Sequence, residues 1–149
     1  VSAGLAVANV FLDGGPIVET QNRDGFSDAQ QASRGQLYDG PMLTLVNEGT
    51  ASASEILAGA LQDDQRSPLL GSRTFGKGLI QTLIGLGGDG SGLAVTVARY
   101  LTPSGRDIQN LGIEPDQRLA DPEPLNPGGD GDTWLEIALN QLAEQIEAG

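Results

Sequence analysis

Two residue types are missing from this chain of 149 residues, which contains no cysteine and no histidine. Without cysteine there can be no disulfide, no thiolate nucleophile and no thiolate metal site. Without histidine the usual general base, the commonest zinc ligand and any Ser-His-Asp triad are excluded as well. A nucleophile in this chain would therefore need lysine, a carboxylate or an amide as its helper.

Positive charge and long apolar runs are also scarce. The chain has 8 basic and 20 acidic residues and a net charge of −12, which repels phosphate backbones and anionic lipid, so we expect no nucleic-acid partner. No apolar run approaches the roughly 20 residues that cross a bilayer, and residues 1–12 lack the pattern of a secretion signal. The length and a hydrophobic content of 38% suit a single core.

The middle of the sequence predicts a strand, a tight turn and a helix. A strand is expected over Met42–Asn47, a turn over the small residues Gly49–Ser54, and a helix that continues to Gln65. Pro68–Leu70 begins a second strand, and the strand-helix-strand order favours parallel pairing. Because open α/β sheets bind ligands at the carboxyl ends of their strands, Ser52 in this turn is the first candidate for chemistry.

The remaining elements follow from shorter patterns. We expect a helix over residues 1–12, a strand over 16–21, and a hairpin of strands 78–86 and 93–101 around the glycine turn 87–92. No capping residue precedes the first helix, which suggests a domain cut from a longer chain. Residues 22–40 are expected to form a mobile surface connection with one brief strand near Gln36–Tyr38, and residues 112–116 to lead out of the core.

Three regions are predicted in chain order: a core over 1–120, a linker over 121–132 and a C-terminal amphipathic helix over 133–149. Proline, glycine and aspartate dominate the linker. The helix has a Thr133–Glu136 capping box. It is expected to dock through one apolar stripe, made of Leu135, Leu139, Leu142 and Ile146.

Ser52 has a structural and a chemical interpretation. Ser52 and Glu55 have the spacing of a capping box, which by itself accounts for both residues. It does not account for the small residues Gly49–Ser54, which allow another chain to approach the free N–H groups of the helix start. Those donors suit a developing oxyanion, and the N–H of Ala53 is the natural member of such an oxyanion hole.

Lys77 also has two interpretations. It stands between Gly76 and Gly78, and a lysine in a glycine turn is most often a solvated charge. A lysine that acts as a base must be neutral, so its pKa must fall from about 10.4 to about 7 or 8, at a cost of roughly 4 kcal/mol. Burial among apolar neighbours such as Phe75 and Leu79 would make this feasible.

Two other ligand sites are disfavoured. Gly71–Lys77 fits the phosphate-loop spacing, but Gly78 stands where that motif needs Ser or Thr for magnesium, and a strand-like run follows in place of a helix. The aspartates of the linker could attract calcium, but their spacing is not that of an EF-hand loop, so a solvated connection is the favoured interpretation.

Three ordered motifs carry a resemblance to a known family. They are Asn47–Ile56, then Thr74–Gly78 with Gln81, then Tyr100–Ile108 with Gly112–Asp116. Together they resemble the carboxyl-terminal processing, or tail-specific, serine proteases over about residues 1–119. The resemblance implies a crotonase-like α/β core, hydrolysis without cofactor or metal, protein or peptide substrates with apolar C-terminal tails, and an extracytoplasmic setting such as the periplasm or the thylakoid lumen.

The resemblance also implies roles for individual residues. Ser52 would be the nucleophile, Lys77 its general base and Gln81 the residue that orients the lysine. In a regular strand, residues four apart are about 13 Å apart, so the chain must turn near Gly78 for Gln81 to reach Lys77. Asp63 falls where some family members carry an aspartate, and we interpret it as a structural residue at the helix end.

The family's glycine-rich segment and its PDZ module have their places upstream of Val1. This chain is therefore expected to be a core fragment with weak or no activity as a Ser-Lys endopeptidase. The alternative is a non-catalytic peptide-binding or assembly module on the same fold, and self-association into a homo-oligomer is left open by the sequence.

Overall fold

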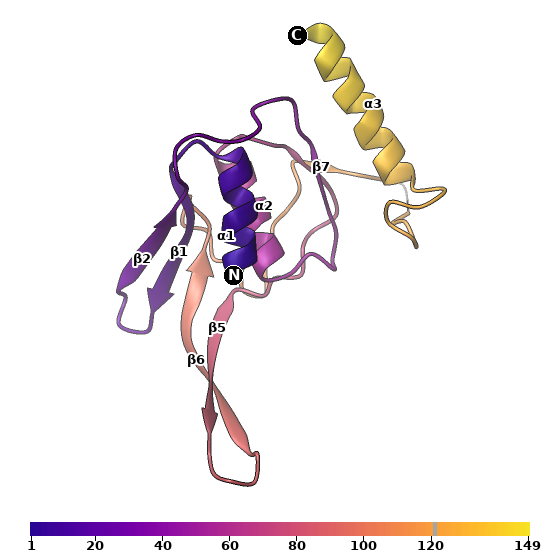
Figure 1. The fold of residues 1–149 in the computed structure, drawn as a ribbon. Coiled ribbons are helices and arrows are strands. Elements are labelled where there is room, and N and C mark those ends of the chain that lie inside the picture. The colour runs from indigo at the N-terminus through magenta and orange to yellow at the C-terminus, as the bar shows by residue number, and fades with distance from the viewer. Residues whose placement is uncertain (121) are drawn as a thin grey trace.

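The computed structural model describes residues 1–120 and 122–149, with the elements arranged as in Figure 1. The helices are α1 (Ser2–Phe11), α2 (Ala53–Asp63) and α3 (Thr133–Ala148). The strands are β1 (Pro16–Asn22), β2 (Ser27–Gln31), β3 (Thr44–Val46), β4 (Leu69–Gly71), β5 (Leu79–Gly85), β6 (Gly92–Leu101) and β7 (Gln117–Arg118). The expected α/β class is confirmed.

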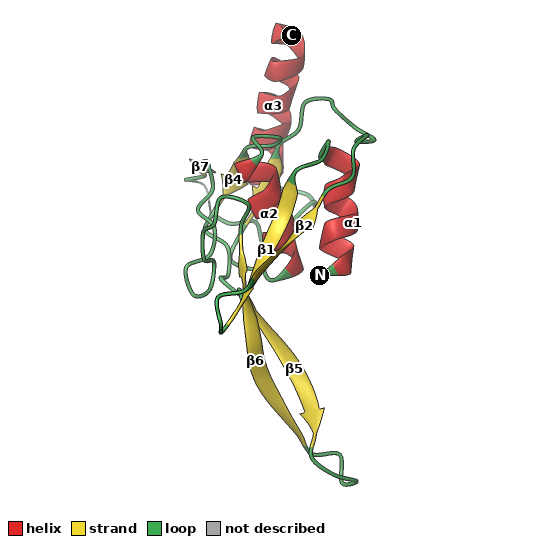
Figure 2. Cartoon of the chain, turned by 90° about the vertical axis from the view of Figure 1, so that its left-hand side faces the viewer, coloured by secondary structure: helices red, strands yellow, loops and turns green. Residues whose placement is uncertain are grey.

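The strands form two sheets of different character. The larger is antiparallel in the order β2-β1-β6-β5, and the smaller is parallel in the order β3-β4-β7. In the smaller sheet Thr44 pairs with Leu69 and Val46 with Gly71, which confirms the predicted strand-helix-strand unit around α2. The predicted hairpin is also confirmed, and its far half extends away from the body (Figure 2).

Helix α2 lies between two groups of buried side chains and is fixed by both. On one side it packs with α1, β1 and the end of β6, through a cluster that includes Leu12, Ile17, Ile56, Leu61 and Tyr100. On its other side Ala58 joins a smaller cluster with strands β3 and β4 and with the chain near residues 108–113. Burial on two sides holds the start of this helix, where Ser52 lies, in one position.

The predicted strand at Gln36–Tyr38 is wrong. The extra strand is β2, which pairs with β1 from Pro16↔Gln31 to Gln21↔Ser27. Its side chains are all exposed, so it lacks the apolar alternation by which strands are recognised. The backbone N–H groups of Leu37 and Tyr38 instead donate to the carbonyl of Val10 in the last turn of α1, where carbonyls have no N–H donor within the helix.

The segment after Gly112 was also misjudged. Ile113 is 1% exposed and belongs to the core, and Gln117 and Arg118 further along form β7, which pairs with β4. The segment therefore completes the parallel sheet and does not leave the core at Gly112. A strand of two residues is too short to leave a periodic signal in the sequence.

Helix α3 forms as predicted but docks differently. Trp134 and Ala138 are its buried residues, and they pack with Leu70 and Leu119. The predicted stripe does not make this contact, because Leu139 is 55% and Ile146 60% exposed. Only the first turns of α3 meet the body, and the rest of the helix extends away from it (Figure 1).

The cap of α3 lies one residue earlier than the predicted Thr133. Asp132 is the N-cap residue, and its side chain accepts a hydrogen bond from Leu135 N at 2.9 Å. The preceding residues 122–132 contain neither helix nor strand, and the division into core, linker and helix stays a prediction. Asp121, the first residue of the predicted linker, lies outside the described residues.

Asp63 closes α2 at the end opposite Ser52. Its carboxylate accepts a hydrogen bond from Ser104 N at 2.9 Å and forms an ion pair with Arg106 at 2.5 Å. With a rise of about 1.5 Å per residue, the helix separates Asp63 from Ser52 by about 16 Å. The structure thus supports the interpretation of Asp63 as a structural residue that attaches the helix end to the turn after β6.

The environment of Asp63 favours its charged form. Burial raises the pKa of this carboxyl, but hydrogen bonds from Thr102 and Ser104 and the charge of Arg106 together lower it below its ordinary value. A carboxyl whose pKa is lowered on folding stabilises the protein above its ordinary pKa, and this stabilisation is lost as the pH falls through the folded value.

The substitution Asp63→Asn should therefore lower the free energy of unfolding by about 1–2 kcal/mol at pH 7. The difference from the unchanged protein should shrink as the pH falls below about 4. Urea unfolding of both proteins at pH 7 and pH 3 measures it. Asp64→Asn is the matched control, because Asp64 is exposed. A difference that is the same at both pH values would show that the charge of Asp63 contributes nothing.

Candidate active site

Ser52 occupies a strained position between β3 and α2. Its backbone has φ 56° and ψ −114°, a region that residues with a side chain rarely adopt and that costs of order 1–3 kcal/mol. Such sharp strand-to-helix turns raise a serine above the helix start in hydrolases of several kinds. The hydroxyl of Ser52 is therefore presented at the positive end of α2.

The side chain of Glu55 organises this turn. Glu55 is fully buried, and the predicted capping box is present. Its Oε2 accepts hydrogen bonds from Ser52 N at 3.0 Å and Lys77 N at 2.9 Å. Its Oε1 accepts from Thr74 Oγ1 at 2.6 Å and Gly76 N at 2.7 Å. One buried carboxylate thus receives four donors from two separate segments of the chain.

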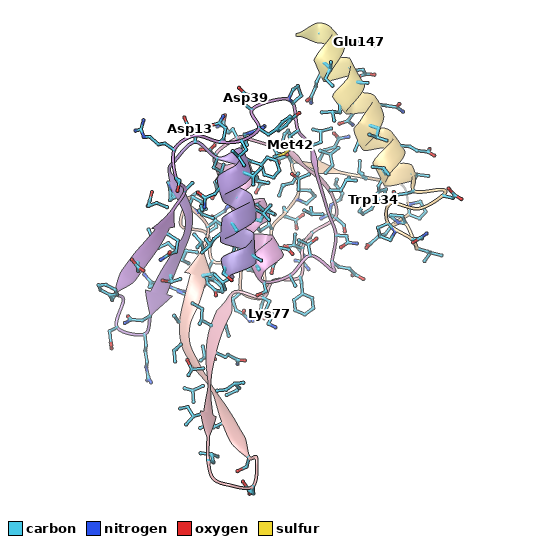
Figure 3. All side chains as sticks on the ribbon, in the orientation of Figure 1. Asp13, Asp39, Met42, Lys77, Trp134 and Glu147 are labelled. Carbon is cyan, nitrogen blue, oxygen red and sulfur yellow. The ribbon has the colours of Figure 1, made fainter. Side chains whose placement is uncertain are left out.

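Glu55 places the serine and the lysine next to each other. Because Ser52 N and Lys77 N donate to the same oxygen, the two nitrogens are at most about 6 Å apart. A second bond joins the same two segments, since Phe75 N donates to Thr50 O at 2.9 Å. Residues 25 apart in the sequence therefore share one site, with Lys77 at the lower edge of the body where β5 begins (Figure 3).

Both glycines beside Lys77 are required by close backbone contacts. Gly76 has φ +91°, and a Cβ there would lie 2.9 Å from Gly112 N. At Gly78 a Cβ would lie 2.8 Å from Gln109 N, and Gly78 N donates to the side chain of Gln109. These contacts fix the backbone on either side of Lys77. The backbone position of Lys77 is therefore set by the packing of its two glycine neighbours.

The expected apolar shelter for Lys77 is not provided by its neighbour Phe75. Lys77, the only lysine of the sequence, has an exposed side chain, and Phe75 is 64% exposed. The physical reason is that residues 75–77 follow the surface between α2 and the chain at 108–112, with their backbone turned inward to Glu55. Their side chains are consequently directed to solvent.

Gln81 lies on β5 just beyond an irregularity in the pairing with β6, between Ile80 and Gln81. Its side chain is exposed, and in the described part of the chain no hydrogen bond joins it to Lys77. Its expected role in orienting the lysine stays a prediction.

Among the described residues no acceptor takes the backbone N–H of Ala53. Ala53 is the first residue of α2, where backbone N–H groups have no acceptor within the helix. Helix α1 approaches this point closely, because a Cβ at Gly4 would lie 2.7 Å from Ala53 O. The chain that enters α1 therefore runs beside the start of α2.

Glu55 is the functional residue that the sequence only partly revealed. The capping-box spacing predicts its bond to Ser52 N, but the three donors from Thr74–Lys77 are contributed by tertiary packing and leave no local pattern.

Within the described residues no group of three or more acidic side chains could hold a metal ion. No helix in that part of the chain has the length and apolar character needed to span a membrane.

The chain is similar to known proteases. The chain is 48% identical over 147 residues to a carboxyl-terminal-processing protease of Picosynechococcus sp., covering 97% of this chain and 35% of the relative. It is 52% identical over 122 residues to the corresponding Synechocystis protein, covering 82% and 28%. Among solved structures, the photosystem II D1 C-terminal processing protease has 50% identity and a TM-score of 0.74, covering 79% and 31%.

The chain spans about a third of the length of these relatives. The sequence profile of Peptidase family S41 matches residues 1–119, the range that contains Ser52, Glu55 and Lys77. The chain belongs to Peptidase family S41.

Proposed function

We propose that this chain carries the catalytic Ser-Lys pair of a serine endopeptidase that cleaves proteins near their C-terminal tails. The observation that supports this most directly is the bond of Ser52 N and Lys77 N to one oxygen of the buried Glu55. A chain without histidine has few other means to deprotonate a serine. The names of the relatives supply the substrate class: proteins processed at their carboxyl ends.

The proposed mechanism assigns a role to each of four residues of the chain. Ser52 Oγ attacks the scissile carbonyl carbon while neutral Lys77 takes the hydroxyl proton. The N–H of Ala53 stabilises the negative charge that develops on the carbonyl oxygen. Lys77 then gives the proton to the leaving amine, and a water activated by the same lysine hydrolyses the acyl-enzyme. Gln81 is assigned the task of orienting the lysine amine.

The exposure of Lys77 sets a condition on this mechanism. A general base must be neutral to accept a proton, and apolar cover favours the neutral form of an amine. In the described residues Phe75 does not supply that cover. We therefore propose that the cover comes from the apolar tail of a bound substrate or from another part of the longer protein, and that the 149 residues alone have weak or no peptidase activity.

The setting of the activity is a separate proposal. Four of the relatives are named as chloroplastic peptidases, which supports an extracytoplasmic location such as the thylakoid lumen or the periplasm.

The first prediction concerns the nucleophile and its base. In a longer protein that contains this chain and the upstream part of the family fold, a fluorophosphonate probe should react with Ser52. The substitution Lys77→Met should slow this reaction at least about 100-fold, the low end of what a positioned base contributes. Labelling is located by mass spectrometry of the digested protein.

Two further variants make this test specific. Ser52→Ala should remove the label, and Arg73→Gln, which also removes one exposed positive charge near the site, should leave the rate unchanged. A fully folded protein whose Ser52 does not react would favour the alternative, a non-catalytic peptide-binding or assembly module.

The second prediction concerns Glu55. Glu55→Gln keeps the size of the side chain but replaces one acceptor oxygen by an NH₂ group, so at least two of the four donors lose their partner. Each unsatisfied group costs about 1–3 kcal/mol, so the free energy of unfolding should fall by about 2–5 kcal/mol.

Glu48→Gln is the matched control for this substitution, because Glu48 precedes the same turn and is exposed. Urea unfolding of the three proteins compares them. Equal stability of the Glu55→Gln and Glu48→Gln proteins would disprove the assigned role of Glu55.

A further inference from the structure

Two side chains hold the backbone on either side of Lys77. Glu55 accepts hydrogen bonds from Gly76 N at 2.7 Å and from Lys77 N at 2.9 Å. On the other side, Gly78 N donates to Gln109 Oε1 at 2.8 Å. Glu55 belongs to α2, whereas Gln109 lies in the segment between β6 and β7. Gln109 therefore attaches the lysine segment to a part of the fold other than the helix.

Gln109 is itself held in one orientation. A backbone N–H can only donate, so Oε1 is the atom that faces Gly78 and Nε2 is the atom that donates to Asn110 Oδ1, at 2.9 Å. The backbone nitrogen of Gln109 donates to Asp107 Oδ1 at 2.9 Å. The other oxygen of Asp107 forms an ion pair with Arg99 at 2.7 Å. Because both its backbone and its amide are held, Gln109 loses little conformational freedom in binding Gly78.

The bond from Gln109 acts where the chain enters β5. Gly78 directly precedes this strand, which begins at Leu79. Its carbonyl oxygen accepts from Tyr100 N at 2.7 Å, so the residue after Lys77 is attached to β6 as well as to Gln109. A glycine by itself permits many backbone conformations. The direction of the chain after Lys77 is therefore set by these attachments.

We propose that Gln109 is a positioning residue for Lys77. The lysine side chain is exposed and has a flexible four-carbon stem. Its amine can return to one place near Ser52 only if the backbone that carries it is fixed. Glu55 fixes the nitrogen of Lys77, and Gln109 fixes the nitrogen of the next residue. This inference rests on the proposed function, in which Lys77 is the general base, and adds a second residue that holds it in place.

The test uses the longer protein that contains this chain and the upstream part of the family fold. The rate at which a fluorophosphonate labels Ser52 is measured over a range of probe concentrations. Gln109→Met removes the acceptor of Gly78 N and keeps a side chain of similar length. We expect the rate at saturating probe to fall at least about tenfold, since a misplacement of about 1 Å can cost about 100-fold. The probe concentration that gives half of this rate should not change.

Gln62→Met is the matched control. Gln62 also makes hydrogen bonds through both ends of its amide, to Glu114 O at 3.0 Å and from Arg106 at 2.9 Å, but it lies at the far end of α2. Its loss should lower the stability of the protein and leave the labelling of Ser52 unchanged.

Gln109→Glu tests rescue, because it keeps an acceptor oxygen for Gly78 N. Its new charge favours the protonated form of an amine nearby, so labelling is followed from about pH 7 to about pH 10. The plateau of the rate at high pH should reach at least about half that of the unchanged protein, whereas the Gln109→Met protein should keep its low plateau.

Hydrogen exchange of the Gly78 N–H reports on the bond without catalysis. It is measured by NMR on the 149-residue chain. Gln109→Met should speed this exchange at least about tenfold, because the N–H loses its acceptor, and Gln62→Met should not. Circular dichroism melting checks that each variant is folded.

Each outcome decides the proposal. Unchanged labelling or unchanged Gly78 exchange in the Gln109→Met protein would overturn it. An equal slowing by Gln109→Met and Gln62→Met, or an equally low plateau for Gln109→Glu and Gln109→Met, would overturn it as well. Failure of Ser52 to react in the unchanged protein would refute the proposed function, and the exchange measurement would still decide whether Gln109 holds the lysine segment.

Discussion

The structure depends on one buried carboxylate that receives four hydrogen bonds. Glu55 is the only group that joins the start of α2 to all of Thr74, Gly76 and Lys77 among the described residues. A buried charge without partners would be unfavourable by several kcal/mol, and charge-assisted bonds to four donors compensate for this. The turn before α2 and the segment 74–77 are thereby joined through one carboxylate. The geometry of the candidate site is thus a consequence of satisfying a buried charge.

The helix that carries Glu55 has to be immobile for this arrangement to persist. Its two sides are buried in separate clusters, and its far end is attached through Asp63 to the turn after β6. The strain at Ser52 is maintained by this fixed frame, since an unsupported turn would relax to an ordinary conformation. Packing and the ion pair of Asp63 hold the helix in place, and Glu55 on that helix then fixes the backbone of Ser52.

The sequence predicted the elements that carry a periodic or capping signal. The β3-α2-β4 unit, the β5–β6 hairpin and the Ser52–Glu55 capping box all have local patterns, and all are present. Strand β2 was missed because its side chains are all exposed, and the docking face of α3 because Trp134 and Ala138 compete with a longer apolar stripe. These outcomes are decided by tertiary contacts, which local patterns do not contain.

The same limit applies to the site. The resemblance implied that Ser52 and Lys77 act together, but it gave no physical reason for their proximity. The hydrogen bonds of both backbone nitrogens to Glu55 supply that reason. The burial that Lys77 would need as a base is not observed, for a related reason. Apolar neighbours in the sequence predict shelter only if the chain folds their side chains inward, and here the inward-facing groups are the backbone nitrogens bound by Glu55.

The exposed lysine gives the proposed mechanism a built-in selectivity. If the base becomes neutral only under apolar cover, then a substrate that brings this cover also activates the enzyme, and a polar segment that reaches the site leaves the amine charged. A peptidase with this requirement leaves polar segments of folded proteins intact, because they do not bring apolar cover to the lysine.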